Sequence, residues 1–409
     1  MLIAAVKLTD IGARAFFVLI VLYSLSARLS GQFGLALTLI GFFSFFSGYE
    51  RYIDLQRVLV GKTASEGDVL IRSVLRFFGL NYLLWLPVLA VLLHWWVQLT
   101  PLAVALWLLI ALGEHFANEA YRMALVTHRH RHVLLVGLAK NLVLVSTVAY
   151  ASFAKRLDCE QLLIIWATLS TLAITVSVGM FILRSIPATP SQKSMAFGLI
   201  EQYRRSRTHF LIGLVAVTSL QIDRLVAGGF LTLENSGVYF RHIFLASSTY
   251  QVFGVVSHNR IMVRIYGSML AGKPSEVRSI IRREQWRYVP LTLGLIGFIL
   301  LAGPVAARDV AAFSTIVPHY LAVLMLAYLV RGIADYNSMI LNAVYAERQI
   351  FKSQLITVLL TTTCSILLTP LFGLPGLIVA VLAGTTIYFL LTGAFARRMI
   401  NLKMKEEQP

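Results

Sequence analysis

Residues 352–398 read KSQLITVLLTTTCSILLTPLFGLPGLIVAVLAGTTIYFLLTGAFARR and contain no Asp, Glu, Lys or Arg between Lys352 and Arg397. One membrane span needs roughly 20 mostly apolar residues in a helix. The segment therefore holds two spans, which we place at 353–370 and 374–395. Basic residues at both ends of the segment are typical of loops on one side of a membrane.

The rest of the chain has the same character. Its 409 residues are 58% hydrophobic and 13% charged, with a mean hydropathy of +0.76, whereas a soluble domain is close to half apolar and a quarter charged. We therefore expect an all-α membrane protein of about twelve transmembrane helices in two six-helix lobes. The ten further spans are expected near 11–28, 33–50, 74–95, 102–122, 133–153, 162–183, 208–230, 237–258, 288–305 and 315–334.

The first apolar run has an alternative reading. Phe16–Tyr23 followed by Ser24-Leu25-Ser26 is also similar to a cleaved signal peptide. We prefer a retained span, because it gives an even number of spans, and an even number fits two equal halves.

The net charge of +17 lies mainly in every second loop between the expected spans. Basic clusters follow the even-numbered spans, while the opposite loops carry few basic residues, chiefly Lys155, Arg156 and Arg308. The positive-inside rule then predicts an inner-membrane protein with both termini cytoplasmic. Clusters between apolar runs favour anionic membrane lipids as partners and argue against nucleic acid.

A polar stretch divides the chain near its middle. We predict a first lobe at 1–184, a cytoplasmic linker at 185–207 and a second lobe with a basic tail at 208–409. The loops Ala124–Arg129 and Ala343–Arg348 match weakly at corresponding places. The match suggests parallel repeats about an axis along the membrane normal, although chance similarity between two basic loops explains it equally well.

Charges inside the first lobe are costly in lipid and so need a partner or a cavity. Glu114 and Glu119 fall in the fourth expected span and Lys140 in the fifth. We expect Glu119 to pair with Lys140, either as a structural ion pair or as the wall of a substrate or proton path. The nearby run His128–His132 is interpreted as a solvated basic loop, since no carboxylate or cysteine accompanies it as a metal ligand.

The second lobe carries Asp223 and Arg224 in its first span and Arg241 in the next. Adjacent residues point about 100° apart on a helix, so one of the first two can bond a neighbouring helix while the other faces a cavity. The alternative is that both reach the outer interface. Most charges at the inner side are expected to be interfacial anchors, although some could line an inward-open mouth: Arg14, Glu50, Arg51, Asp54, His258, Arg260, Arg331 and Asp335.

The stretch Gln221–Leu231, with its Asp-Arg pair and Gly228-Gly229, followed by Gly237-Val-Tyr239, resembles the seventh and eighth spans of bacterial polysaccharide flippases. These belong to the multidrug/oligosaccharidyl-lipid/polysaccharide exporter superfamily. The resemblance implies transfer of an undecaprenyl-diphosphate oligosaccharide, such as an O-antigen or exopolysaccharide repeat unit, to the outer leaflet. It also implies a polysaccharide polymerase and a chain-length regulator as partners, and no cofactor.

The resemblance also implies roles for single residues. Arg224 and Arg241, with Asp223, are substrate-contact candidates, because Arg suits phosphate recognition. Lipid II flippases of the same superfamily use arginines in their first, second and eighth spans, which suggests Arg14, Arg51 and Arg260 here. Glu114, Glu119 and Lys140 are candidates for ion or proton coupling, and Asp223 is another.

Two other functions compete with the flippase. An ion-coupled drug antiporter would have the same architecture, but the first expected span has only Asp10, at its entrance, where an antiporter should bury a carboxylate. A membrane enzyme of glycan synthesis would need a sizeable outer loop and a nucleophile–base set, and the sequence offers neither. A phosphate-binding loop of the G-x-x-x-x-G-K-[ST] type is also absent, so we expect neither an enzyme nor an ATP-driven pump.

Overall fold

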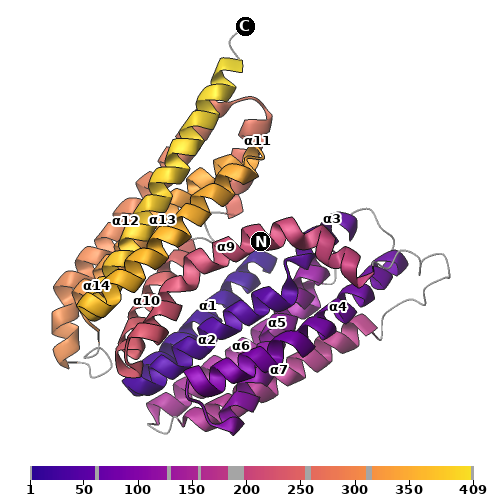
Figure 1. Ribbon diagram of the computed structural model, residues 1–409, viewed down its shortest axis with the longest axis vertical. Helices are drawn as coiled ribbons and strands as arrows, with labels where there is room; N and C mark the ends of the chain where they lie inside the picture. Colours follow the sequence, from indigo (N-terminus) through magenta and orange to yellow (C-terminus); the bar gives the residue numbers. More distant parts are fainter. Residues whose placement is uncertain are drawn as a thin grey trace. The chain divides into compact units, whose positions relative to one another are not determined.

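The computed structural model describes residues 2–59, 64–126, 130–154, 158–182, 198–253, 259–309 and 316–406, which form helices and, within those ranges, no strand. The chain divides into two compact units. Unit 1 contains Met1–Leu25 and Gln32–Val217, and unit 2 contains Ser26–Gly31 and Thr218–Pro409. Each unit is a bundle of long helices (Figure 1).

Unit 1 packs around its fifth helix. Its elements are α1 Leu2–Ser24, most of α2 Ala27–Gly48, α3 Arg51–Leu59, α4 Ala64–Val91 with a π-helical turn η1 Leu92–Trp96, α5 Pro101–Val126, α6 His130–Phe153, α7 Cys159–Ile182 and the first part of α9 Leu199–Phe230. α5 contacts α6 and α7, and α1 contacts α6. The buried rings of Phe17, Phe33, Trp107 and Trp166 lie 4.9–6.1 Å apart in tilted and edge-on pairs, which aromatic quadrupoles favour.

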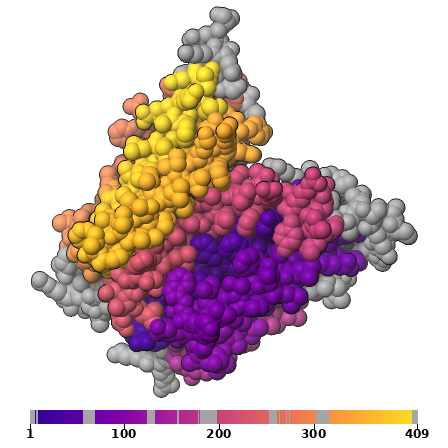
Figure 2. Space-filling model, viewed as in Figure 1, coloured from indigo at the N-terminus to yellow at the C-terminus, as the bar shows by residue number. Residues whose placement is uncertain are grey.

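Unit 2 packs around α13. Its elements are the end of α9, α10 Leu233–Phe253, α11 Asn259–Leu270, α12 Pro274–Asp309, α13 Pro318–Ala343 and α14 Glu347–Glu406. α13 contacts α10, α11, α12 and α14. Figure 2 shows α13 and α14, in orange and yellow, side by side on one face of this unit.

The segment with no charged residues forms two helical stretches joined at a bend. α14 bends at Gly373, whose φ of 63° and ψ of −139° interrupt the helix between Pro370 and Pro375. An L side chain rarely adopts this left-handed backbone, so glycine fits the bend. The two spans expected at 353–370 and 374–395 lie on either side of it.

α2 crosses α10 with their backbones in contact inside unit 2. A Cβ placed on Gly237 would lie 1.8 Å from the carbonyl oxygen of Ala27, and one on Gly31 would lie 2.1 Å from that of Leu233. Small residues four apart, here Ala27 and Gly31, allow this close approach between membrane helices. The same α2 continues into unit 1 from Gln32 onward.

The all-α membrane fold is confirmed, and each expected span overlaps a helix. Seven described segments are long and apolar enough to cross a membrane by length and composition: Ala27–Gly48, Val69–Trp96, Pro101–Met123, His132–Phe153, Cys159–Ser177, Leu199–Phe230 and Glu347–Leu402. The first span was expected at 11–28, whereas α1 ends at Ser24 and α2 begins at Ala27. The Ser26 hydroxyl accepts a hydrogen bond from the Leu29 amide, 3.3 Å away, at the start of α2. Such a side-chain acceptor is typical of a helix N-cap.

Short helices and helix ends occupy regions expected to be loops. α3 and α11 lie where we expected basic loops, and residues 199–207 of the expected linker form the first turns of α9. These turns are stabilised by the Glu201–Arg205 pair, Oε1 to Nε 2.7 Å, at spacing i, i+4. Linker residues 185–197 and residues 128 and 129 of the histidine-rich loop lie outside the described residues.

Candidate functional site

Unit 2 contains a small, partly open cavity between α9, α13 and α14. Its volume is about 30 Å³, room for roughly two water molecules. Two side chains of opposite charge, Asp223 and Arg331, line the cavity. Five hydroxyl side chains also line it: Ser219, Tyr328, Thr357, Thr361 and Thr385. A guanidinium and several hydroxyls in one site can bind an anionic oxygen by charge-assisted hydrogen bonds.

The Asp-Arg and Gly-x-Tyr parts of the sequence motif are joined through Asp223, which lines this cavity. The Tyr239 hydroxyl donates a hydrogen bond to the Asp223 carboxylate, and both residues are buried. Gly237, two residues earlier, is where α10 touches α2. The motif therefore positions α10 through its glycine and ties it to α9 through its tyrosine.

Arg224 is held between α10 and α13. Its guanidinium lies 4.8 Å from the centre of the Phe244 ring and interacts electrostatically with the Tyr328 side chain. Asp223 and Arg224 thus have different neighbours, as expected for adjacent helical positions. Asp223 lines the cavity, while Arg224 approaches it through Tyr328.

Arg331 and Asp335 form the second charged pair of unit 2. Nε of Arg331 lies 3.6 Å from Oδ1 of Asp335, Nη1 donates to the Ser219 hydroxyl at 3.1 Å, and the guanidinium lies 4.1 Å from the Tyr388 ring centre. Asp335 in turn accepts a hydrogen bond from the Tyr250 hydroxyl. Arg331 is only 5% exposed.

We placed Arg331 and Asp335 among inner-side charges that serve either as interfacial anchors or as the lining of an inward-open mouth, and in the structure both bond to neighbouring helices of unit 2. We ended the span at residue 334, whereas α13 continues to Ala343, so both side chains lie inside the helix bundle. A signal was present in the sequence: Tyr328, Arg331 and Asp335 recur at i, i+3 and i+7 and so share one helix face.

A buried ion pair holds α5 against α6 in unit 1. Nζ of Lys140 lies 2.5 Å from Oε1 of Glu114, Nη1 of Arg14 lies 3.2 Å from Oε2, and the Trp166 indole donates to Oε1 at 3.0 Å. The Glu114 and Lys140 side chains are each 5% exposed. Arg14 is the half-exposed member of the group, so it is the one that a second ligand can reach.

The expected pairing of Lys140 with Glu119 is wrong. Glu119 instead lies 2.5 Å, Oε1 to Nη1, from Arg122. Residues 114 and 119 are about 140° apart around α5, so only one of them can face Lys140. Arg122 also stacks over the Tyr52 ring, 3.8 Å from its centre.

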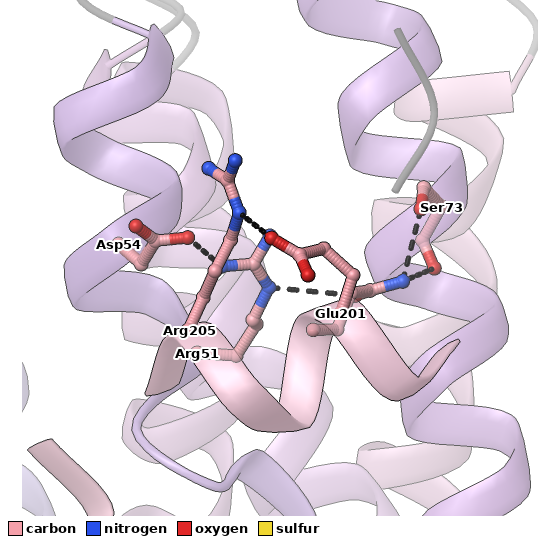
Figure 3. Close-up of polar contacts among 6 residues, drawn as sticks. Arg51, Asp54, Ser73, Glu201 and Arg205 are labelled. Carbon is pink, nitrogen blue, oxygen red and sulfur yellow. Dashed lines mark hydrogen bonds and ion pairs between the residues drawn. The ribbon is translucent and has the colours of Figure 1, made fainter. Parts of the chain in front are cut away.

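Arg51 is fully buried and ties three helices of unit 1 together (Figure 3). It pairs with Asp54 in α3 and donates from Nε to the Gln202 side-chain oxygen in α9, 3.4 Å away. Gln202 then donates to the Ser73 hydroxyl of α4 at 3.0 Å. These contacts are those of a packing residue.

The other two predicted arginines lie elsewhere. Arg241 is 3% exposed and donates from Nη2 to the Ser30 hydroxyl, 3.1 Å away, beside the crossing of α2 and α10. Arg260 lies in the first turn of α11, and its side chain is not among the described ones. Of the predicted site residues, the structure brings Asp223 and Arg224 together in unit 2, and Arg14, Glu114 and Lys140 together in unit 1.

Glu50 gives unit 1 a pH dependence that can be tested. It follows α2 in the short link before α3, where burial raises its carboxyl pKa above the ordinary 4.5, opposed by Arg122 and by a hydrogen bond with Tyr52. A raised folded-state pKa means that the residue's contribution to stability is lost as pH rises through that pKa. Glu50→Gln should therefore raise the melting temperature relative to the unmodified protein at pH 7.5 but not at pH 4. A shift of equal size at both pH values would contradict this origin.

The chain is thus a polytopic helical protein with one buried charged cluster in each unit. No family model and no curated sequence matches the chain. Solved structures do. The lipid II flippase MurJ in an inward closed conformation superposes with a TM-score of 0.70 at 14% identity, over 96% of this chain and 86% of that one.

Two multidrug transporters have the same fold. An inward-facing MATE family transporter of the MOP superfamily gives a TM-score of 0.69 at 12% identity, over 98% of this chain and 96% of that one. A point mutant of the Vibrio cholerae MATE transporter VcmN gives 0.64 at 14% identity, over 98% and 95%. The chain thus has the twelve-helix fold that MurJ and MATE transporters share.

Proposed function

We propose that the protein is a flippase that moves an undecaprenyl-diphosphate-linked oligosaccharide across the bacterial inner membrane by alternating access, for O-antigen or exopolysaccharide synthesis. The observation that carries the proposal is the buried Arg331, which lines a cavity rich in hydroxyl groups. Tyr328, which also lines the cavity, interacts with a second arginine, Arg224. Guanidinium groups favour phosphate, because their planar N–H donors match its oxygens. The fold shared with MurJ supports a lipid-linked substrate.

In this proposal, the buried polar core of unit 2 recognises the diphosphate. The cavity of about 30 Å³ takes single oxygen atoms and not a sugar, so transport requires this core to open. Opening exchanges the Arg331–Asp335 and Asp223–Tyr239 contacts for contacts with substrate. Such exchange keeps each charge partnered, which low-dielectric surroundings require.

The predicted coupling residues differ in how firmly they are held. Glu114 already has Lys140, Arg14 and Trp166 as partners, and this favours a structural role for Glu114 and Lys140. Glu119 has a half-exposed Arg122 as its ion-pair partner, and Asp223 has a phenol. We therefore propose Glu119 and Asp223 as the carboxylates that exchange a proton or an ion during transport.

The proposal also includes the orientation of the protein in the membrane and the proteins that act on its product. Both termini would be cytoplasmic, since the basic loops share one parity. A polymerase that joins the repeat units and a regulator of chain length would act on the flipped product. Arg14, Arg51, Arg241 and Arg260 stay candidates by resemblance, with Arg51 and Arg241 already engaged in helix packing.

An ion-coupled drug antiporter is the second candidate function. The similarity to MATE transporters and the presence of two carboxylates, Asp223 and Asp335, in the unit 2 core support it. The two functions predict different phenotypes in a strain from which the gene is deleted. Loss of surface glycan with lipid-linked oligosaccharide accumulating on the cytoplasmic side supports the flippase. Drug sensitivity with normal surface glycan supports the antiporter.

Removing the Arg331 guanidinium should reduce glycan export. Arg331→Gln alone leaves Asp335 without its cation, so the informative variant is the charge-balanced Arg331→Gln/Asp335→Asn. We expect about a ten- to hundred-fold loss of transport, since a hydrogen bond to a charged group is worth about 1.5–3 kcal/mol. Surface glycan is measured in the deletion strain at matched protein abundance. Full export by the double variant would remove Arg331 from the substrate site.

A further inference from the structure

A basic groove lies on the surface of unit 2 where α11 meets α12. Its volume is about 660 Å³. Four arginines and a single carboxylate line it, together with an indole ring: Arg264, Glu276, Arg282, Arg283, Trp286 and Arg287. Every one of these side chains is exposed. The groove is therefore open and strongly cationic.

The packing of α11 and α12 directs this charge outward. The apolar side chains of α11, Ile261 and Ile265, are fully buried within unit 2, so its polar face is the one that remains accessible. On α12, Val277, Ile281 and Tyr288 are buried on one face. The arginines occupy the opposite face of α12, at positions 282, 283 and 287.

The exposed face of α12 changes from basic to apolar along its length. Trp286 is 69% exposed, and the same face continues through Leu293, Phe298 and Leu301, which are 48%, 65% and 81% exposed. From Trp286 to Leu301 the helix rises by about 22 Å, a large part of the hydrocarbon thickness. A tryptophan between arginines and exposed apolar side chains is typical of the membrane–water boundary.

A water-soluble anion would use only the basic part of this surface. A ligand that matches all of it carries an anionic phosphate and long apolar chains in one molecule. We propose that the groove is a binding site for an anionic phospholipid, with its phosphate among Arg264, Arg282 and Arg283 and its acyl chains along the Leu293–Leu301 face of α12. The site is separate from the buried core of unit 2 and does not depend on the transport activity proposed above.

Trp286 serves as a local reporter for the experiment. The full chain is placed in nanodiscs of phosphatidylcholine, and brominated phosphatidylglycerol or brominated phosphatidylethanolamine with identical acyl chains is added in steps. The Trp286 signal is the difference between the unmodified protein and Trp286→Phe. We expect the phosphatidylglycerol lipid to quench this signal at a mole fraction about twenty-fold lower than the phosphatidylethanolamine lipid, because the arginines attract its net negative charge.

The variant Arg282→Gln/Arg283→Gln should remove this preference, because each arginine contributes about 1 kcal/mol to anionic lipid binding, which for two is about a twenty- to thirty-fold change. The matched control is Arg397→Gln/Arg398→Gln, which removes the same charge from exposed positions of α14 in the same unit. The control should keep the preference.

Two results would overturn the proposal. Equal quenching by both brominated lipids in the unmodified protein would mean that the face contacts bulk lipid without selection. Displacement of the phosphatidylglycerol by an equimolar amount of undecaprenyl diphosphate would assign the groove to a polyprenyl lipid instead. Melting temperatures of all variants are measured in parallel, so that a loss of folding is distinguished from a loss of binding.

Discussion

Gly237→Val will prevent stable folding of unit 2. The Cβ of any side chain at this position would lie 1.8 Å from the Ala27 carbonyl oxygen and 2.9 Å from the Gly31 amide nitrogen. Both are backbone atoms of α2, so no side-chain rotation relieves the overlap. Inserting atoms into a packed interior usually costs about 1–3 kcal/mol, and an overlap with two backbone atoms belongs at or above the top of that range.

The measurement is the yield of monodisperse protein in mild detergent and its melting temperature. Gly294→Ala is the matched control, because a Cβ on Gly294 of α12 meets no atom within 4 Å. In a helix interior this control should be neutral or stabilising by about 0.5–1 kcal/mol. Normal yield and melting temperature for Gly237→Val would show that α2 and α10 can separate without loss of the fold.

Glu114→Ala will strongly destabilise unit 1. The change leaves the Lys140 ammonium, whose side chain is 5% exposed, without its carboxylate and removes the acceptor of the Trp166 indole. Breaking a buried ion pair by removing one partner typically costs about 3–5 kcal/mol, because the remaining charge is uncompensated. Denaturation in a titration of sodium dodecyl sulfate reports the change.

A second variant identifies the cause. Glu114→Gln/Lys140→Met removes both charges and keeps side-chain volume, so it should recover most of the stability lost in Glu114→Ala. If the double variant is as unstable as the single one, packing around Glu114 and not the uncompensated lysine would explain the loss. The same pair of variants tests coupling, since a protein that is stable without either charge and still exports glycan does not use them for transport.

The fold was predictable because hydropathy is a sum over about 20 residues, and such sums tolerate errors in single positions. The segment between Lys352 and Arg397 is long enough for two spans under any choice of boundary. Loop parity predicts the orientation in the membrane, which stays a prediction. The break at Ser24–Ser26 was missed because the serine that caps α2 lies inside an apolar run and changes the window average little.

Partners of buried charges were not predictable to the same degree. Each residue turns a helix by about 100°, so a boundary error of two residues directs a side chain to a different neighbour. We paired Lys140 with Glu119 by depth alone, and helix rotation gives it Glu114. The expected span ended at residue 334, before the end of α13, so it left open whether Arg331 and Asp335 are anchors or line a cavity. Asp223 was selected through its motif, which requires no knowledge of rotation, and its role in a site stays a prediction.

The close crossing of α2 and α10 joins two helices that are synthesised at different times. Ser30 and Arg241 bond across 211 positions of sequence. At about 5–20 residues per second, the ribosome needs roughly 10 to 40 s to complete the chain between them. During that interval the glycine face of α2 has no α10 to pack against. Unit 2 therefore completes its packing after unit 1, although its segment Ser26–Gly31 is synthesised near the beginning of the chain.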